Sequence, residues 1–174
     1  RWEREIGRDL VAGARMANEE QGEPFDLVVV DTGSEHVVVV EGEEVPIYQS
    51  EASRLVRVVS GARFLIDEVG VMALIGPVFS TSCAAAAVVA EAAGVPLIAP
   101  LAQQSGLDSL GTHLFQLNPV PEVQGQALAE YATLVLGLET LAILSPLSDY
   151  GYAFEQAFTK TATSNGGRVV HSDW

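Results

Sequence analysis

The spacing of apolar residues changes several times along the first third of the chain. Over residues 3–20 an apolar residue recurs every third or fourth position among charged ones, which predicts an amphipathic helix. The run DLVVVD at 26–31 is continuously apolar between two aspartates, a pattern typical of a strand covered on both faces. Helical spacing returns over 50–69, where Gly70 is expected to end the helix.

A different pattern separates that strand from the second helix. Residues 37–40 (VVVV) and 45–49 (VPIYQ) flank a short acidic stretch that contains Gly42. Two runs rich in β-formers around such a turn predict an inserted β-hairpin. Pro46 marks the second run as an edge strand, because proline cannot donate to a ladder.

The rest of the chain alternates short apolar runs with helical segments. Strands are expected at 71–76, 95–100, 113–118, 140–145 and 168–172, and helices at 82–93, 122–137 and 151–165. This order predicts an α/β fold with a doubly wound, mostly parallel sheet and right-handed crossovers. The Pro119-Val120-Pro121 break is the best candidate for a domain boundary.

Composition and charge exclude several classes of protein. The 174 residues are 48% hydrophobic and 18% charged, which is too apolar for a disordered chain. The net charge of -14 lacks the basic footprint of a nucleic-acid binder and disfavours anionic membranes. No apolar run reaches the roughly 18 residues of a membrane span, so the protein itself is not expected to cross a membrane. One cysteine can form neither an internal disulfide nor a cysteine-rich zinc site.

The loop after the strand at 71–76 carries the most suggestive chemistry. In open α/β sheets, ligands bind beyond the carboxyl ends of the strands. There Ser80, Thr81 and Ser82 offer hydroxyls and backbone N–H groups at a helix N-terminus, a good place for an anion such as a carboxylate. The plain alternative is that one of them caps the helix. The two roles are compatible.

Catalytic equipment is sparse. The GxGxxG, GxxxxGK[ST] and GxSxG patterns are absent, and His36, His113 and His171 are scattered without metal-ligand spacing. We therefore expect no catalytic residue, no metal and no cofactor, and we interpret the histidines as surface or packing residues. Cys83 lies where a helix N-terminus would favour a thiolate, although the alanines around it favour a small buried side chain. Tyr150, in the Ser-Asp-Tyr-Gly turn, belongs either to a simple helix start or to a ligand site.

Three segments resemble a known family when they are taken in order. They are GARFLIDEVGVMALIGPVFSTSCAAAAVVAEAAGVPLIAPLAQQSGL, HLFQLNPVPEVQGQALAEYA and LAILSPLSDYGYAFEQAF. Their order and spacing resemble the type I periplasmic binding proteins, and more narrowly the branched-chain amino acid (leucine/isoleucine/valine) receptors of ABC transporters. The resemblance implies two Rossmann-like lobes that close on a ligand, with residues 1–120 in lobe one and 121–174 at the start of lobe two.

The resemblance also implies roles for particular residues. Ser80 matches the hydroxyl that binds the ligand carboxylate, and Thr81 and Ser82 supply neighbouring donors. Leu101 and Ala102 match positions whose backbone faces the ligand.

Two further positions complete the implied site. Gln103 stands where the family usually has Thr or Ser near the ligand amino group, and Tyr150 matches an aromatic residue that lines the site from the second lobe. The inserted hairpin and the larger Gln103 are departures from the family pattern. A third departure is that the chain looks like a fragment. It begins at the family's first helix, without the first strand, and the acidic residue that meets the ligand ammonium is expected beyond Trp174.

The leading hypothesis is an extracytoplasmic solute-binding protein, periplasmic or extracellular and with a lipid anchor as an option, that binds an amino acid or similar small polar ligand. It is not expected to be an enzyme, and an ABC permease is its implied partner. The alternative is a ligand-sensing or protein-interaction domain of a larger envelope protein, which the hairpin and Gln103 favour. A Rossmann-like enzyme is the third hypothesis, against which the missing phosphate-loop glycines count.

Overall fold

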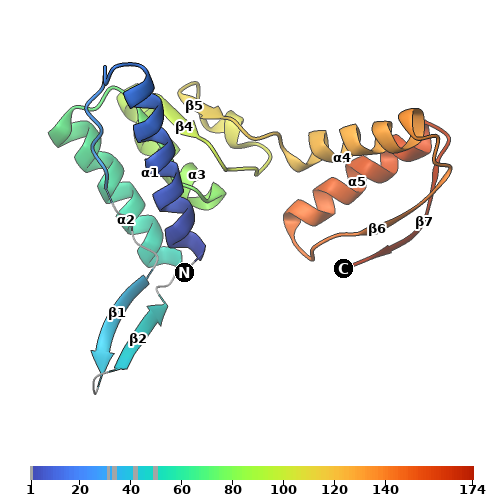
Figure 1. Cartoon of the computed structure of the whole chain (residues 1–174), viewed down its shortest axis with the longest axis horizontal. Helices are drawn as coiled ribbons and strands as arrows, with labels where there is room; N and C mark the ends of the chain where they lie inside the picture. Colours follow the sequence, from blue (N-terminus) through green and yellow to red (C-terminus); the bar gives the residue numbers. More distant parts are fainter. Residues whose placement is uncertain (1, 31, 33–34, 41–42, 49–50) are drawn as a thin grey trace. The chain divides into compact units, whose positions relative to one another are not determined.

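The structure is a computed structural model that describes residues 2–30, 32, 35–40, 43–48 and 51–174, with side chains for 5–30, 32 and 52–174. Helices and strands alternate along it, which confirms the predicted α/β class (Figure 1). The chain divides into two compact units. The first comprises Arg1–Ala102 and Asp108–Phe115, and the second comprises Gln103–Leu107 and Gln116–Trp174. The assignment of lobes at residue 120 stays a prediction.

Apart from the segment at 26–31, the elements follow the predicted order, and the strands β3, β4 and β5 are shorter than predicted. Up to residue 116 they are α1 (Trp2–Glu20), β1 (Glu35–Val40), β2 (Glu43–Tyr48), α2 (Glu51–Arg63), the π-helical η1 (Phe64–Val69), β3 (Leu74–Ile75), α3 (Ser80–Ala93), β4 (Leu97–Ala99), the 3-10 turn η2 (Leu107–Leu110) and β5 (Leu114–Gln116). Beyond it they are α4 (Pro121–Glu130), the π-helical η3 (Tyr131–Val135), β6 (Thr140–Leu144), α5 (Asp149–Ser164) and β7 (Arg168–Asp173). The predicted glycine cap is confirmed at Gly70, whose φ of 73° lies in the left-handed region that glycine adopts most readily.

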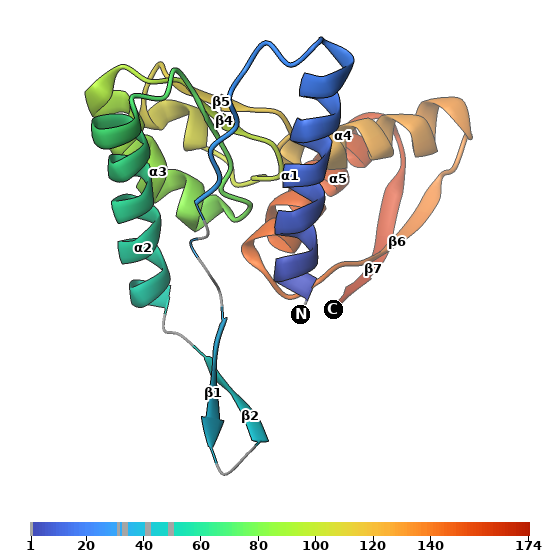
Figure 2. The same ribbon diagram turned by 60° about the vertical axis from the view of Figure 1, so that its left-hand side comes forward.

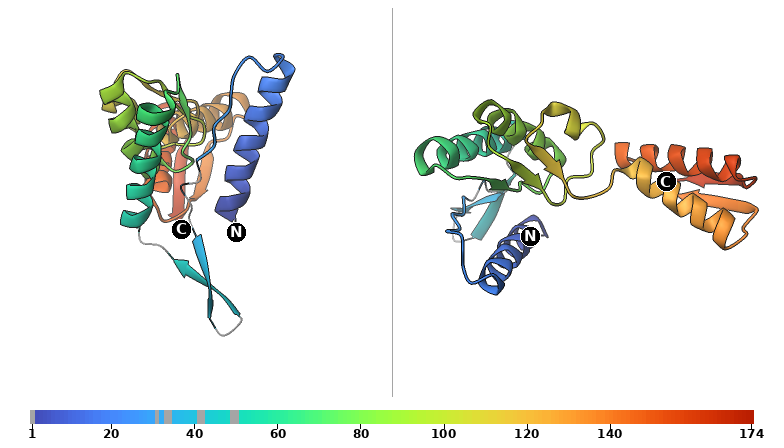
Figure 3. Two further views of the ribbon diagram at one scale, coloured as in Figure 1. Left: turned by 90° about the vertical axis from the view of Figure 1, so that its left-hand side faces the viewer. Right: turned by 90° about the horizontal axis from the view of Figure 1, so that it is seen from above.

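The first unit is a small sheet with helices on both faces. Its strands lie in the order β3-β4-β5, and β3 and β4 are parallel with Leu74 opposite Leu97. Helices α2 and α3 pack together on one side of the strands, and α1 lies on the other (Figure 3). The buried core consists largely of small side chains from α3, with Leu97 and Ala99 of β4. Short side chains on α3 let the helix approach the sheet closely.

The predicted strand at 26–31 is wrong for the residues that the structure describes. Residues 26–30 carry no strand hydrogen bonding, and Val29 is 53% exposed. The segment is held by side chains at its ends instead. Asn18 bonds both the N–H and the C=O of Phe25, and Arg57 Nε donates to the Thr32 carbonyl at 2.7 Å. The cause is that an apolar run specifies burial, whereas a strand also requires a ladder partner, which local sequence does not supply.

The predicted hairpin is confirmed. β1 and β2 pair antiparallel, with Val38 opposite Val45 and Pro46 opposite Val37 (Figure 2). The turn residues 41–42 lie outside the described part of the chain.

The second unit is built on two helices and two strands. β6 and β7 run parallel, with a bulge after Leu141, and α4 and α5 pack closely on each other (Figure 1). Its buried cluster joins both helices to β6 and consists of Ala129, Ile143, Phe158 and Ala162. The helices meet at Gly125, where an added Cβ would collide with the Phe154 carbonyl oxygen. A residue without a side chain at position 125 therefore sets how closely α4 and α5 can approach.

Candidate functional site

The N-terminus of α3 lies just beyond the carboxyl end of β3. Phe79 occupies the N-cap position with an extended backbone (φ -86°, ψ 144°), and its side chain makes no capping bond. The first turn of α3 contains no acidic residue. The backbone N–H groups of a helix's first turn and the positive end of its dipole both favour an anion at such a place. The N-cap position is not occupied by Ser80, Thr81 or Ser82, so the plain capping interpretation of these hydroxyls is wrong.

The three hydroxyl residues differ in accessibility. Ser80 is half-buried and Thr81 is exposed, whereas Ser82 is 1% exposed. Successive residues of a helix point about 100° apart, so all three cannot face one ligand equally. Ser80 and Thr81 are the accessible hydroxyls at this end of α3, and Ser82 belongs to the packed interior.

A cation from α2 stands beside the same helix start. The Arg54 guanidinium lies over the Phe79 ring, 5.1 Å from its centroid, at cation–π distance. Its positive charge adds to that of the helix dipole. The electrostatics of this region therefore suit a carboxylate better than a cation.

Cys83 is not part of the chemistry. It is completely buried, and its Sγ donates to the Pro77 carbonyl at 2.9 Å. Burial raises the pKa of the Cys83 thiol to about 12, so the group stays protonated at neutral pH. The expectation of a small buried side chain is confirmed.

The loop after β4 brings a second group of predicted residues to the same edge of the sheet. β3 and β4 are parallel neighbours, so the turn before Ser80 and the loop at Leu101 leave the sheet at their carboxyl ends. Leu101 is exposed and Ala102 is buried. Gln103 is half-buried and belongs to the second compact unit. The structure thus gathers residues 80–82 and 101–102 at one sheet edge of the first unit.

Tyr150 lies in the second unit, at the second residue of α5. The Tyr150 hydroxyl donates to Gln124 Oε1 at 2.9 Å, and its ring stacks on Phe154 with the centroids 6.1 Å apart. The predicted helix start is confirmed, because the Ser148 side chain, two residues before Tyr150, caps α5 by accepting from the Gly151 N–H at 3.2 Å. Tyr150 is therefore held in place from two sides.

Gln124 is the residue that sequence analysis missed. It lies in the first turns of α4, and its Nε2 donates to the Pro119 carbonyl at 2.8 Å. Tyr150 follows it by 26 positions, and only the packing of α4 on α5 brings the two together. A pattern within one element could not have signalled this pair.

The opposite end of α3 carries a polar cluster with a structural role. The Glu91 carboxylate accepts from the backbone N–H groups of Thr112 and His113, from the Thr112 hydroxyl and from His113 Nδ1 at 2.9 Å. The backbone N–H of His113 is the largest cause that lowers the pKa of Glu91 to about 2, followed by the His113 side chain. The cluster ties α3 to the start of β5, which confirms that His113 is a packing residue.

The remaining histidines are His36 and His171. His171 is exposed, and its Nε2 lies 4.0 Å from Asp173 Oδ2, while the side chain of His36 lies outside the described residues. Among the described side chains, no group of three His, Cys, Asp or Glu could hold a metal ion.

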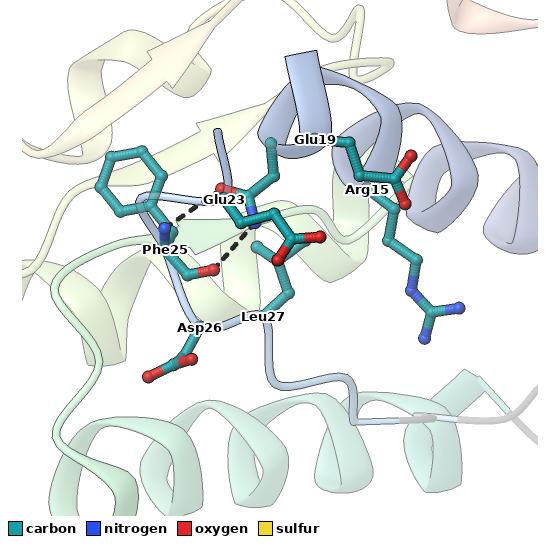
Figure 4. A pocket seen from close by; sticks show the side chains of 7 residues that line it. Arg15, Glu19, Glu23, Phe25, Asp26 and Leu27 are labelled. Carbon is teal, nitrogen blue, oxygen red and sulfur yellow. Dashed lines mark hydrogen bonds between the residues drawn. The ribbon is translucent and has the colours of Figure 1, made fainter. Parts of the chain in front are cut away.

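A surface hollow lies at the end of α1. It is lined mainly by Arg15, Glu19, Glu23, Phe25 and Asp26 (Figure 4). Three carboxylates against one guanidinium make it net negative, so it would repel a carboxylate ligand.

Among the described helices, none has the length and apolar character that a bilayer-spanning segment requires.

Most of this chain matches a known protein family. The sequence profile of the periplasmic binding proteins matches residues 51–174, which include both helix starts. The chain belongs to the periplasmic binding protein family. No curated protein matches the sequence.

Solved structures of this family share the fold. A leucine binding protein from Thermotoga maritima is 25% identical with a TM-score of 0.64, and the match covers 97% of this chain and 44% of that one. A branched-chain amino acid transporter substrate binding protein from Streptococcus pneumoniae, in complex with isoleucine, is 26% identical with a TM-score of 0.56, covering 77% and 38%. A solute binding protein of an ABC transporter from Rhodopseudomonas palustris, in complex with p-hydroxybenzoic acid, is 25% identical with a TM-score of 0.57, covering 73% and 34%. This chain therefore spans less than half the length of each of these structures.

Proposed function

We propose that this chain is part of a solute-binding protein that holds a small carboxylate-bearing solute without chemical change and serves ABC-type uptake. An amino acid is the expected ligand class. The expected location is the periplasm or the extracellular face of the membrane, and the expected partner is an ABC permease. The family to which the chain belongs supports each of these expectations.

One observation carries the proposal. The start of α3 has no side-chain cap at Phe79 and no acid in its first turn, and it lies at the sheet edge with the Ser80 and Thr81 hydroxyls accessible. A carboxylate there would be stabilised by the positive end of the helix dipole and by the accessible hydroxyls. The Arg54 guanidinium over Phe79 adds positive charge at the same place.

The ligands of the structural neighbours have one chemistry in common. Isoleucine and p-hydroxybenzoate each pair a carboxylate with a separate hydrogen-bond donor, an ammonium in the first and a phenol in the second. In our proposal Ser80, Thr81 and the backbone of Leu101 and Ala102 serve the carboxylate side. Tyr150 and Gln103 serve the remainder of the solute, and Ser82 supports the helix start from the interior.

Calorimetric titration of the intact protein tests the proposal. The panel is L-leucine, L-isoleucine, L-valine and p-hydroxybenzoate, and at least one is expected to bind. Ser80→Ala should weaken that ligand by about 10-fold to 100-fold, because a hydrogen bond to a charged group contributes about 1.5–3 kcal/mol. The matched control is Ser60→Ala, which removes an exposed hydroxyl from α2 of the same unit. Absence of binding by every member of the panel, or equal affinities for Ser80→Ala and wild type, would contradict the proposal.

The β1–β2 hairpin favours a second candidate, a sensing or interaction domain of a larger envelope protein. A two-stranded hairpin is marginally stable alone in water, so this one is a natural place for a protein partner. Replacing residues 35–48 by a short Gly-Ser linker separates the candidates. If transport is the role, solute affinity and uptake survive the replacement. If interaction is the role, the replacement abolishes a complex that size-exclusion chromatography detects with wild type.

A further inference from the structure

Three groups of the second unit form a continuous hydrogen-bonded chain. The Tyr150 hydroxyl donates to Gln124 Oε1 at 2.9 Å, and Gln124 Nε2 donates to the Pro119 carbonyl at 2.8 Å. Pro119 lies in the segment that leads from β5 into α4, Gln124 in α4 and Tyr150 in α5. This series of hydrogen bonds therefore connects three separate pieces of backbone through two side chains.

The direction of every proton in this chain is fixed. A backbone carbonyl can only accept, so the NH₂ of Gln124 must face Pro119, and its carbonyl oxygen must face Tyr150. That oxygen can only accept as well, so the Tyr150 hydroxyl must be the donor. Its single proton is then committed to Gln124, and only its oxygen lone pairs remain for another partner.

The tyrosine ring itself has little freedom. Tyr150 is half-buried and stacks on Phe154, which in turn stacks on Phe158. The bond to Gln124 holds the far end of the ring. A hydroxyl fixed in place and in proton direction presents a defined acceptor, whereas a rotating hydroxyl would serve donors and acceptors alike.

We propose that Gln124 is a positioning residue that makes the Tyr150 hydroxyl an acceptor toward the ligand, so that the site selects solutes bringing an N–H or O–H donor to it. This inference rests on the proposed solute-binding function and on the placement of Tyr150 in the site. Gln124 acts only through Tyr150. Solutes with a carbonyl oxygen at the corresponding position are rejected, because two acceptors would then face each other without a proton.

The probes are pairs of solutes, one of which carries a hydrogen-bond donor at the position where the other carries a carbonyl oxygen. L-leucine is compared with 4-methyl-2-oxopentanoate, which keeps the carboxylate and the carbon skeleton but replaces the ammonium by a keto oxygen. p-Hydroxybenzoate is compared with p-formylbenzoate in the same way. The intact wild-type protein is expected to prefer the donor member of the pair that it binds by about tenfold or more, as sites built around a hydrogen bond do.

Three variants separate positioning from structural support. Gln124→Met keeps the length of the side chain but cannot accept from Tyr150, and should reduce the preference by about fivefold or more. Gln124→Glu still accepts from Tyr150 but loses the bond that Gln124 donates to Pro119, and should restore part of the preference. Gln126→Met is the matched control on the same helix, since Gln126 is exposed and bonds only Glu130 among the contacts seen for its side chain. It should leave the preference unchanged.

The outcomes distinguish the inference from the function on which it rests. If wild type binds no member of either pair, the solute-binding function and the positioning role are both contradicted. If wild type binds without preferring the donor, or if Gln124→Met weakens both members of a pair equally, the positioning role is overturned and solute binding stands. The ratio of affinities carries this information, because a general loss of packing would lower both affinities and leave the ratio intact. Should Gln124→Met fail to fold, Tyr150→Phe removes the hydroxyl that is proposed as the acceptor, and a donor preference that survives this change would overturn the role.

Discussion

The helices α3 and α5 start at equivalent places in the fold but differ in their N-cap residues and in the charge of their first turns. Each follows the carboxyl end of a parallel strand after a short turn. At α5, Ser148 caps the helix with its own side chain, and Asp149 places a negative charge in the first turn. At α3, Phe79 offers no cap, and the first turn has no acid.

The difference shows that topology alone does not make a binding site. The carboxyl edge of a parallel sheet positions both helix starts, but α5 meets the demands of its N–H groups and dipole from within the chain. α3 has neither a side-chain cap at Phe79 nor an acid in its first turn. The identity of two or three residues at the helix start therefore separates a self-sufficient junction from one suited to an external anion.

Ser80→Asp is the strongest way to break the contrast. It gives α3 the first-turn acid that α5 already has, so the variant's own carboxylate competes with that of the solute. We expect affinity to fall by about 100-fold or more, while the acid stabilises the helix by about 0.3–1 kcal/mol. Calorimetry measures the first effect and thermal unfolding the second.

The control for that prediction is Thr163→Asp, which adds the same charge at an exposed position near the C-terminal end of α5. It should leave affinity nearly unchanged. A Ser80→Asp variant that binds as tightly as wild type would show that the α3 start is not the anion site.

Ser148→Ala tests the other side of the contrast. Loss of the cap should cost about 1 kcal/mol of unfolding free energy, because a hydroxyl that satisfies a helix N–H disappears. Chemical denaturation measures the loss. Ser164→Ala removes an exposed hydroxyl from the far end of α5 and should change stability by less than about 0.5 kcal/mol. Equal stabilities for Ser148→Ala and Ser164→Ala would mean that α5 does not depend on its cap.

Glu91→Gln tests the other end of α3, where, unlike at the start of the helix, a carboxylate of the chain itself bonds neighbouring groups. The pKa of Glu91 is about 2 in the folded protein against a usual 4.5, so its stabilisation is complete above about pH 4.5 and is lost as pH falls through about 2. The variant should melt below wild type at pH 7, and the gap should close between pH 4.5 and 2. Melting curves across this range measure it, with the exposed Glu139→Gln as control. A gap that is independent of pH would contradict the assignment.

Sequence patterns predicted the architecture well wherever one element carries its own signal. The amphipathic stripe gave α1, and the glycine after residue 69 ended the second helix in the left-handed conformation that only glycine adopts easily. The hydroxyls after the predicted strand at 71–76 indicated a helix N-terminus, and α3 begins at Ser80, two residues before the expected start at residue 82. These features depend on residues within a few positions of one another.

Features that depend on distant residues escaped prediction. The segment at 26–30 has the composition of a strand without the ladder, because pairing is decided by a neighbour far along the chain. The Gln124–Tyr150 bond and the Glu91–His113 pair span 26 and 22 positions and follow from helix packing and from the return of the chain to β5. The resemblance implied a site role for Tyr150, which stays a prediction, but gave no reason to consider Gln124.

The absence of a side chain at Gly125 limits how this site could be rebuilt in another protein. An added methyl group there would strike the Phe154 carbonyl and push α5 away from α4. The neighbouring Gln124 would then no longer reach Tyr150, although every polar atom would still be present. Transplanting the polar side chains to another scaffold would therefore fail unless the spacing of the two helices were copied with them.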